Sequence, residues 1–200
     1  MSALKHTTEA LATTTTKELS YAKLGTWLFL ASEIMLFGAL FSSYILLREG
    51  SPTWPHGWEH LNVNLATLNT VFLITSSVTV ILSYLRIQKG DVAGFRKFML
   101  ATILLGCAFL VVKYFEYSHK IHLGLLPKTS LFFGIYYVMT GLHVLHIIGG
   151  LVVNAYLMGP GVALHRENPE KFVGRIEAAG LYWHFVDLVW IFLFPTIYLL

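Results

Sequence analysis

Charged residues are scarce in this sequence. Lysine, arginine, aspartate and glutamate make up 12% of its 200 residues, whereas soluble domains carry about 25%. Apolar residues account for 56% of the chain, so too few charges remain to cover a soluble protein of this size. The net charge of +3 is small and no basic run occurs, which argues against nucleic-acid binding. The composition therefore predicts a membrane protein.

Cysteine is almost absent as well. The single Cys107 lies in an apolar run, which excludes a disulfide framework and a cysteine-rich metal site. The sequence also lacks a P-loop, a GxSxG elbow, an HExxH pair and a Rossmann fingerprint. It shows no internal repeat, so an inverted-repeat transporter is a weak interpretation. No soluble catalytic domain is expected.

What the sequence does contain is five long apolar segments, at about residues 24–47, 66–85, 98–115, 131–158 and 178–200. Each is long enough to cross a bilayer as a helix, which needs roughly 17–25 residues. Only helices are expected, because lipid offers the backbone no hydrogen-bond partners. The sequence predicts an all-α, polytopic bundle of five transmembrane helices over residues 21–200. Residues 1–20 are polar and threonine-rich and predict a flexible tail or a short surface helix.

The distribution of lysine and arginine predicts the orientation of this bundle. Ten of the 14 basic residues fall on the side that holds the N-terminus, and four fall on the other side. Because basic residues are enriched on the cytoplasmic side of membrane proteins, we expect a cytoplasmic N-terminus and an external C-terminus. The expected location is the bacterial cytoplasmic (inner) membrane.

One carboxylate lies deep in the first span. Glu33 follows the inner end of that span by about nine residues, which places it near mid-membrane at about 1.5 Å per residue. An isolated charge there costs about 2.5–3.5 kcal/mol on insertion scales, so such residues usually face other protein. Two hypotheses stay open for Glu33: a carboxylate that carries or buffers protons, and a hydrogen-bonded structural residue.

Ionisable residues also mark the last two spans. His143 and His146 share one face of the fourth span, and Glu177, His184 and Asp187 share one face of the fifth. They could be haem or metal ligands, but two histidines three residues apart cannot bind both faces of one haem, and a metal site needs further ligands. The favoured interpretation is an interhelical polar clasp made by all five. Lys113 and Glu116 predict an ion pair near the outer end of the third span.

Several stretches together resemble subunit III of the haem-copper oxidases, over about residues 21–200. In order along the chain they are SEIMLF (32–37), LNT (68–70), KGD (89–91), EY (116–117), TGLHVLHIIGG (140–150) and EAAGLYWHFVDLVWIFLFPTIYLL (177–200). The chain is most similar to the bacterial five-helix type, whereas longer members have two further spans. Lys113 stands where many members have glutamine, and Val144 where many have glycine.

This resemblance implies a non-catalytic subunit of a proton-pumping oxidase that reduces oxygen with electrons from cytochrome c. It implies direct packing on subunit I, with subunit II, small subunits and a larger respiratory assembly as further partners. It also implies that haems and copper reside in partner subunits, that this chain holds no redox centre, and that phospholipid can bind. Glu33 matches the family's membrane carboxylate. A quinol oxidase subunit III, an accessory protein of nitric oxide reductase and a di-haem electron carrier stay open as alternatives.

Overall fold

A computed structural model describes residues 21–200, and every residue in this range that belongs to regular secondary structure is helical. The predicted N-terminal tail lies outside the described residues. The long helices are α2 (Tyr21–Glu49), α4 (Val63–Gln88), α5 (Val92–His122), α6 (Leu131–Met158) and α8 (Pro169–Phe194). Short helices are α3 (Gly57–His60), the 3₁₀ turn Pro160–Val162, α7 (Ala163–Glu167) and the π-helical turn Pro195–Leu199, which continues α8.

Within residues 21–200, five helices are long and apolar enough to cross a membrane, as the sequence predicted. The predicted fourth span coincides with α6, whereas other spans lie inside longer helices: α5 begins at Val92 instead of residue 98, and α8 begins at Pro169 instead of residue 178. The extra turns carry charged residues, such as Arg96, Lys97 and Arg175. Hydropathy marks only the part of a helix that lies in hydrocarbon, and the helix itself ends where its backbone is capped.

Side-chain caps define these helix starts. Asn62, Asp91, Ser130 and Asn168 each accept a hydrogen bond from the backbone N–H three residues ahead, which begins α4, α5, α6 and α8. Pro169 occupies the first position of α8, where a missing N–H costs nothing. These caps satisfy first-turn donors that have no intrahelical acceptor.

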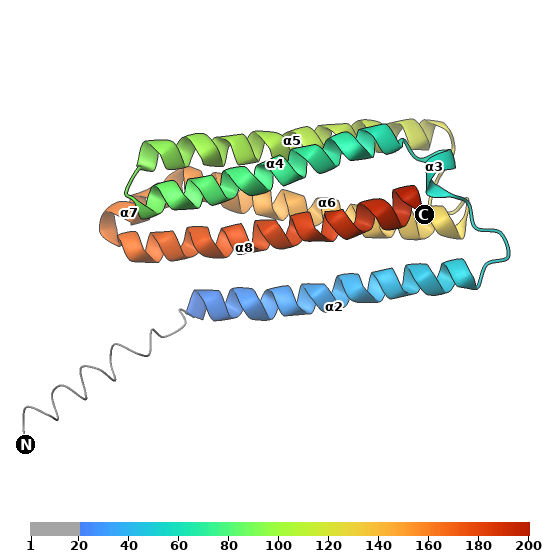
Figure 1. Ribbon diagram of the computed structural model, residues 1–200, viewed down its shortest axis with the longest axis horizontal. Helices are drawn as coiled ribbons and strands as arrows, with labels where there is room; N and C mark the ends of the chain where they lie inside the picture. Colours follow the sequence, from blue (N-terminus) through green and yellow to red (C-terminus); the bar gives the residue numbers. More distant parts are fainter. Residues whose placement is uncertain (1–20) are drawn as a thin grey trace, which may run out of the picture.

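Helices α4 and α5 form an antiparallel pair whose buried residues follow steps of three and four (Figure 1). This spacing is the heptad pattern of helices that pack at a shallow angle. The buried seam of α4 is Ala66, Asn69, Leu73, Ser76, Val80, Ser83 and Ile87. The buried seam of α5 is Phe95, Met99, Thr102, Gly106, Phe109, Lys113, Glu116 and Lys120.

Helix α8 runs through the middle of the bundle and packs against α2, α4 and α6. Its Trp183 fills a space left open by two glycines: a Cβ atom would lie 3.0 Å from the indole at Gly106 and 2.7 Å from it at Gly150. The indole N–H donates to Ser76 Oγ on α4 at 2.9 Å. Trp183 thus joins α4, α5, α6 and α8 at one point.

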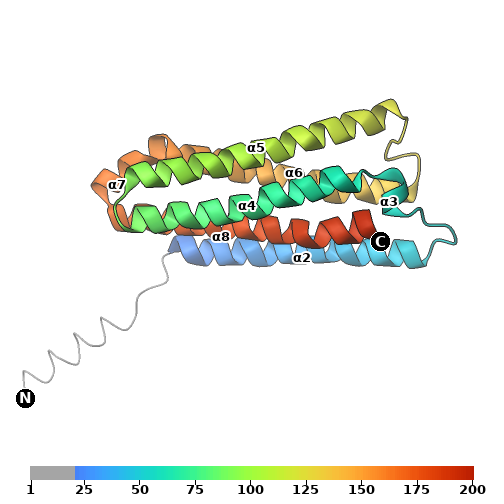
Figure 2. The same cartoon turned by 45° about the horizontal axis from the view of Figure 1, so that its top comes forward.

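Helix α2 lies at the edge of the bundle, beside α8 in both views (Figures 1 and 2). Many of its large apolar side chains are exposed, including Leu28, Ile34, Met35 and Leu46. In a membrane such a surface faces lipid tails or another hydrophobic protein surface. The contacts that α2 makes with α6 and α8 therefore matter for the position of Glu33.

Candidate functional site

Glu33 lies where α2 meets α6, and it is paired. Its Oε2 is 3.0 Å from His146 Nε2, and the two side chains are 14% and 13% exposed. The other ring nitrogen of His146 lies 2.8 Å from the carbonyl of Leu142, and the ring of Phe37 packs edge-on against the imidazole. The Tyr182 hydroxyl of α8 donates to the His146 carbonyl at 2.9 Å. Three helices thus position this pair.

The hydrogen-bond partners of His146 constrain its protons. The Leu142 carbonyl can only accept, so Nδ1 carries a proton. One further proton then lies between Nε2 and the carboxylate, either on the imidazole or on Glu33. Both arrangements have the same net charge, and the proton moves along a single hydrogen bond between them. The geometry therefore holds one proton between side chains of two helices, α2 and α6.

His143, one turn away on α6, faces the bundle interior. Its ring stacks on Trp190 at a centroid distance of 5.2 Å and meets the edge of Phe109 at 5.7 Å. The side chain is fully buried, and neither ring nitrogen has a hydrogen-bond partner among residues 21–200. Burial without a partner strongly disfavours a charged imidazole. His143 is packed as a neutral aromatic ring.

The predicted clasp residues of α8 lie on its side toward α4. His184 Nδ1 lies 2.5 Å from Ser77 Oγ on α4. Asp187 is buried near the same serine, and neither of its carboxylate oxygens has a well-formed hydrogen bond within the described range. Glu177 lines a small cavity between α4 and α8, which His184 also lines.

The predicted clasp residues therefore do not meet in one cluster. The structure joins Glu33 to His146 and directs His184 to Ser77 on α4, not to the histidines of α6. The reason is rotational: residues three apart on a helix point about 60° apart, so His143 and His146 face different neighbours. Within residues 21–200, no three His, Cys, Asp or Glu side chains are grouped closely enough to hold a metal ion.

A second polar group was only partly predicted. It lies where the C-terminal end of α5, the first turns of α6 and the π-helical turn after α8 meet. The expected Lys113–Glu116 ion pair exists at 2.8 Å, but Lys120 also bonds Glu116, at 2.6 Å. The hydroxyls of Tyr136 and Tyr198 donate to the same carboxylate at 3.2 Å and 2.8 Å. We call these five residues the Lys–Glu–Lys cluster. The sequence could have indicated the position of Lys120, because residues 113, 116 and 120 continue the steps of three and four that mark the buried seam of α5.

The cluster is buried, although an interfacial ion pair was expected. Lys113, Glu116 and Lys120 are 2%, 5% and 3% exposed. The ammonium of Lys113 also bonds Tyr198 and lies 4.6 Å from the centre of the Trp190 ring. Its charge is therefore stabilised by a carboxylate, a hydroxyl and an aromatic face.

These features define an integral membrane protein: a five-helix bundle whose ionisable groups are held between helices. The chain belongs to the cytochrome c oxidase subunit III family, whose model matches residues 6–200. The match begins earlier than residue 21, where the resemblance read from the sequence began.

Curated relatives agree with this assignment. The chain is 39% identical to "Cytochrome c oxidase subunit 3" of Corynebacterium diphtheriae, over 87% of this chain and 85% of that one. It is 32% identical to "Cytochrome bo(3) ubiquinol oxidase subunit 3" of Pseudomonas putida, over 88% and 84%. It is also 33% identical to "Heme-copper oxidase subunit I+III" of Aeropyrum pernix, over 86% of this chain and 22% of that longer one. As a member of this family, the chain is a non-catalytic subunit of an oxidase complex.

Proposed function

We propose that this chain is subunit III of a proton-pumping cytochrome c oxidase, in which it stabilises subunit I and supports proton uptake. The haems and copper belong to partner subunits, and this chain binds none. Its direct partner is subunit I. The Aeropyrum pernix relative, whose name joins subunits I and III, supports this choice. Subunit II, small subunits and a larger respiratory assembly are further partners in this proposal.

The observation that carries the proton role is the Glu33–His146 pair. It lies about 18 Å from the first residue of α2, at about 1.5 Å per residue. In the proposed orientation, the N-terminus is in the cytoplasm, the C-terminus is outside, and the membrane is the bacterial inner membrane. The pair is then near the middle of the membrane, and its shared proton can be exchanged with a neighbouring subunit.

The test is Glu33→Gln in the assembled oxidase. We expect the variant to copurify with subunit I, since α2 keeps its packing on α8, and to take up protons more slowly during turnover. Proton uptake would be followed with a pH-sensitive dye in reconstituted vesicles. The matched control is Glu49→Gln, an exposed glutamate at the other end of α2. Loss of subunit I from the Glu33→Gln preparation would replace the proton role with a structural one.

A quinol oxidase subunit III is the second candidate, favoured by the Pseudomonas putida relative that carries this name. The two candidates differ in the electron donor of the complex. Oxygen consumption by the purified complex, with reduced cytochrome c or with a quinol as the only donor, separates them. Phospholipid bound to the complex would be identified in the same preparation by mass spectrometry.

A further inference from the structure

The Lys–Glu–Lys cluster contains more positive than negative charge. Lys113 and Lys120 bind separate oxygens of Glu116, so two ammonium groups share one carboxylate. The remaining members, Tyr136 and Tyr198, are neutral when they donate to that carboxylate. Among the residues that the structure describes, one positive charge of the cluster is left without a paired carboxylate. An unbalanced charge in a buried position is costly unless an anion approaches it.

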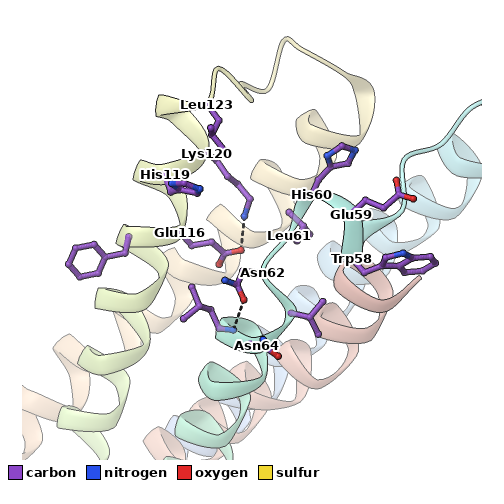
Figure 3. A pocket seen from close by; sticks show the side chains of 13 residues that line it. Trp58, Glu59, His60, Leu61, Asn62, Asn64, Glu116, His119, Lys120 and Leu123 are labelled. Carbon is purple, nitrogen blue, oxygen red and sulfur yellow. Dashed lines mark hydrogen bonds and ion pairs between the residues drawn. The ribbon is translucent and has the colours of Figure 1, made fainter.

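Lys120 is the member that can reach such an anion. Its ammonium has three N–H donors, and two acceptors are present in the described part of the chain, Glu116 Oε1 and Tyr136 Oη. Lys113, in contrast, meets Glu116, Tyr198 and the Trp190 ring. Lys120 also lines a pocket of about 800 Å³ that opens at the outer end of the bundle (Figure 3).

The start of α4 lines the same pocket. Residues 61–65 form part of its wall, and they include Asn62, the N-cap, and Asn64 in the first turn. The Asn62 side chain accepts from Leu65 N, which leaves the first-turn amides of Val63 and Asn64 without an intrahelical acceptor. The N-terminus of this 26-residue helix carries a partial positive charge that favours anions. The positive end of α4 and the Lys120 ammonium thus border the same pocket.

The pocket wall also holds two histidines, an exposed glutamate and apolar side chains, besides Glu116 of the cluster. His119 lies one residue from Lys120, and His60 faces the opening from α3 (Figure 3). Glu59 is exposed and lies across the pocket from Lys120 (Figure 3). Phe115, Leu123 and Trp58 add exposed apolar surface at the rim.

We propose that this pocket binds a phosphate group, with Lys120 and the first turn of α4 as its donors. A phosphate offers several charged acceptor oxygens to these donors, and it supplies the missing counter-charge of the cluster. The source is the head group of an anionic phospholipid in the outer leaflet or free phosphate. This site is separate from the Glu33–His146 pair and does not depend on the proposed proton role.

The test uses Asn64→Asp in the purified oxidase complex. Asn64 is exposed, and an aspartate in the first turn of α4 suits the helix dipole, so the fold is expected to persist. The new carboxylate occupies the pocket wall and competes with phosphate for the same donors. Asn64→Ser is the neutral control at this position. Lys128→Met is the control for loss of an exposed basic residue on the outer loop.

Two measurements distinguish the sources. In the first, inorganic phosphate is titrated into delipidated complex by calorimetry. In the second, the complex is exchanged into phosphatidylcholine nanodiscs that contain phosphatidylglycerol, and tightly held phosphatidylglycerol is counted by native mass spectrometry. We expect Asn64→Asp to weaken binding at least tenfold in one or both, whereas both controls bind like the unmodified complex. An effect on the lipid alone identifies a head-group site, and an effect on phosphate alone identifies a free-anion site.

Two results would overturn the proposal. The first is that Asn64→Asp changes neither phosphate affinity nor lipid retention. The second is that a structure of the assembled complex shows an acidic side chain of a partner subunit bonded to Lys120. The pocket would then be part of a protein interface, and the charge balance of the cluster would be completed by protein.

Discussion

Replacing Glu116 with glutamine should destabilise the bundle more than any other change of a single charge. Glu116 accepts from two ammonium groups at 2.8 Å and 2.6 Å and from two tyrosine hydroxyls at 3.2 Å and 2.8 Å. Glutamine keeps the shape and one acceptor oxygen but removes the only anion of the Lys–Glu–Lys cluster. Removal of one partner from a buried ion pair costs about 3–5 kcal/mol, because it leaves uncompensated buried charge.

This loss can be measured as thermal stability. A chain of this length shifts its midpoint temperature by about 2–4 °C per kcal/mol, so Glu116→Gln should lower it by roughly 6–20 °C. The assay is the temperature at which this chain dissociates from the purified complex, followed on native gels. Glu49→Gln, an exposed glutamate on α2, is the control and should change little.

A triple variant tests the physical reason. Lys113→Met and Lys120→Met, combined with Glu116→Gln, remove both stranded charges while keeping similar volumes. Because apolar replacement of a whole buried ionic group is often neutral or stabilising, we expect at least half of the lost stability to return. If the triple variant is as unstable as Glu116→Gln alone, the loss does not come from unpaired lysines and the electrostatic reasoning is wrong.

Two further predictions concern the contacts of α6 with α8 and with α2. Gly150→Ala should cost about 1–3 kcal/mol in the same thermal assay, because the new methyl group would lie 2.7 Å from the Trp183 ring. Gly141→Ala on the same helix meets nothing within 4 Å and should be harmless; equal losses in both variants would rule out the steric explanation. His146→Gln should slow proton uptake to the same extent as Glu33→Gln, and the double variant should be no slower, since either change removes the shared proton. Additive effects in turnover assays would mean that the two residues act separately.

The number and type of spans could be predicted from sequence because they follow from local composition. A helix that crosses hydrocarbon must be apolar over about 20 residues, and each of the five segments meets this demand without reference to its neighbours. The family was also readable, since its motifs are contiguous stretches such as the one at residues 177–200. The predicted starts of α5 and α8 were less accurate. Asp91 and Asn168 cap initial turns that contain charged residues, and hydropathy does not detect these turns.

The partners of the buried ionisable residues could not be predicted in the same way. In water, an apolar stripe shows which face of a helix is inside, but in lipid both faces are apolar and this signal is lost. The sequence places Glu33 at membrane depth, yet its pairing with His146 depends on how α2 rests on α6 and α8.

The sequence by itself therefore determined that this protein is a five-helix membrane bundle of the oxidase subunit III type, because apolar length and contiguous motifs are local properties. Apart from the Lys113–Glu116 pair, only the tertiary structure decided which buried charges meet. In the folded bundle, His184 contacts Ser77, and His143 packs between aromatic rings. Two lysines bind one carboxylate, at the wall of an open pocket. These contacts depend on helix rotation and depth, which many weak packing interactions fix together and no single segment encodes.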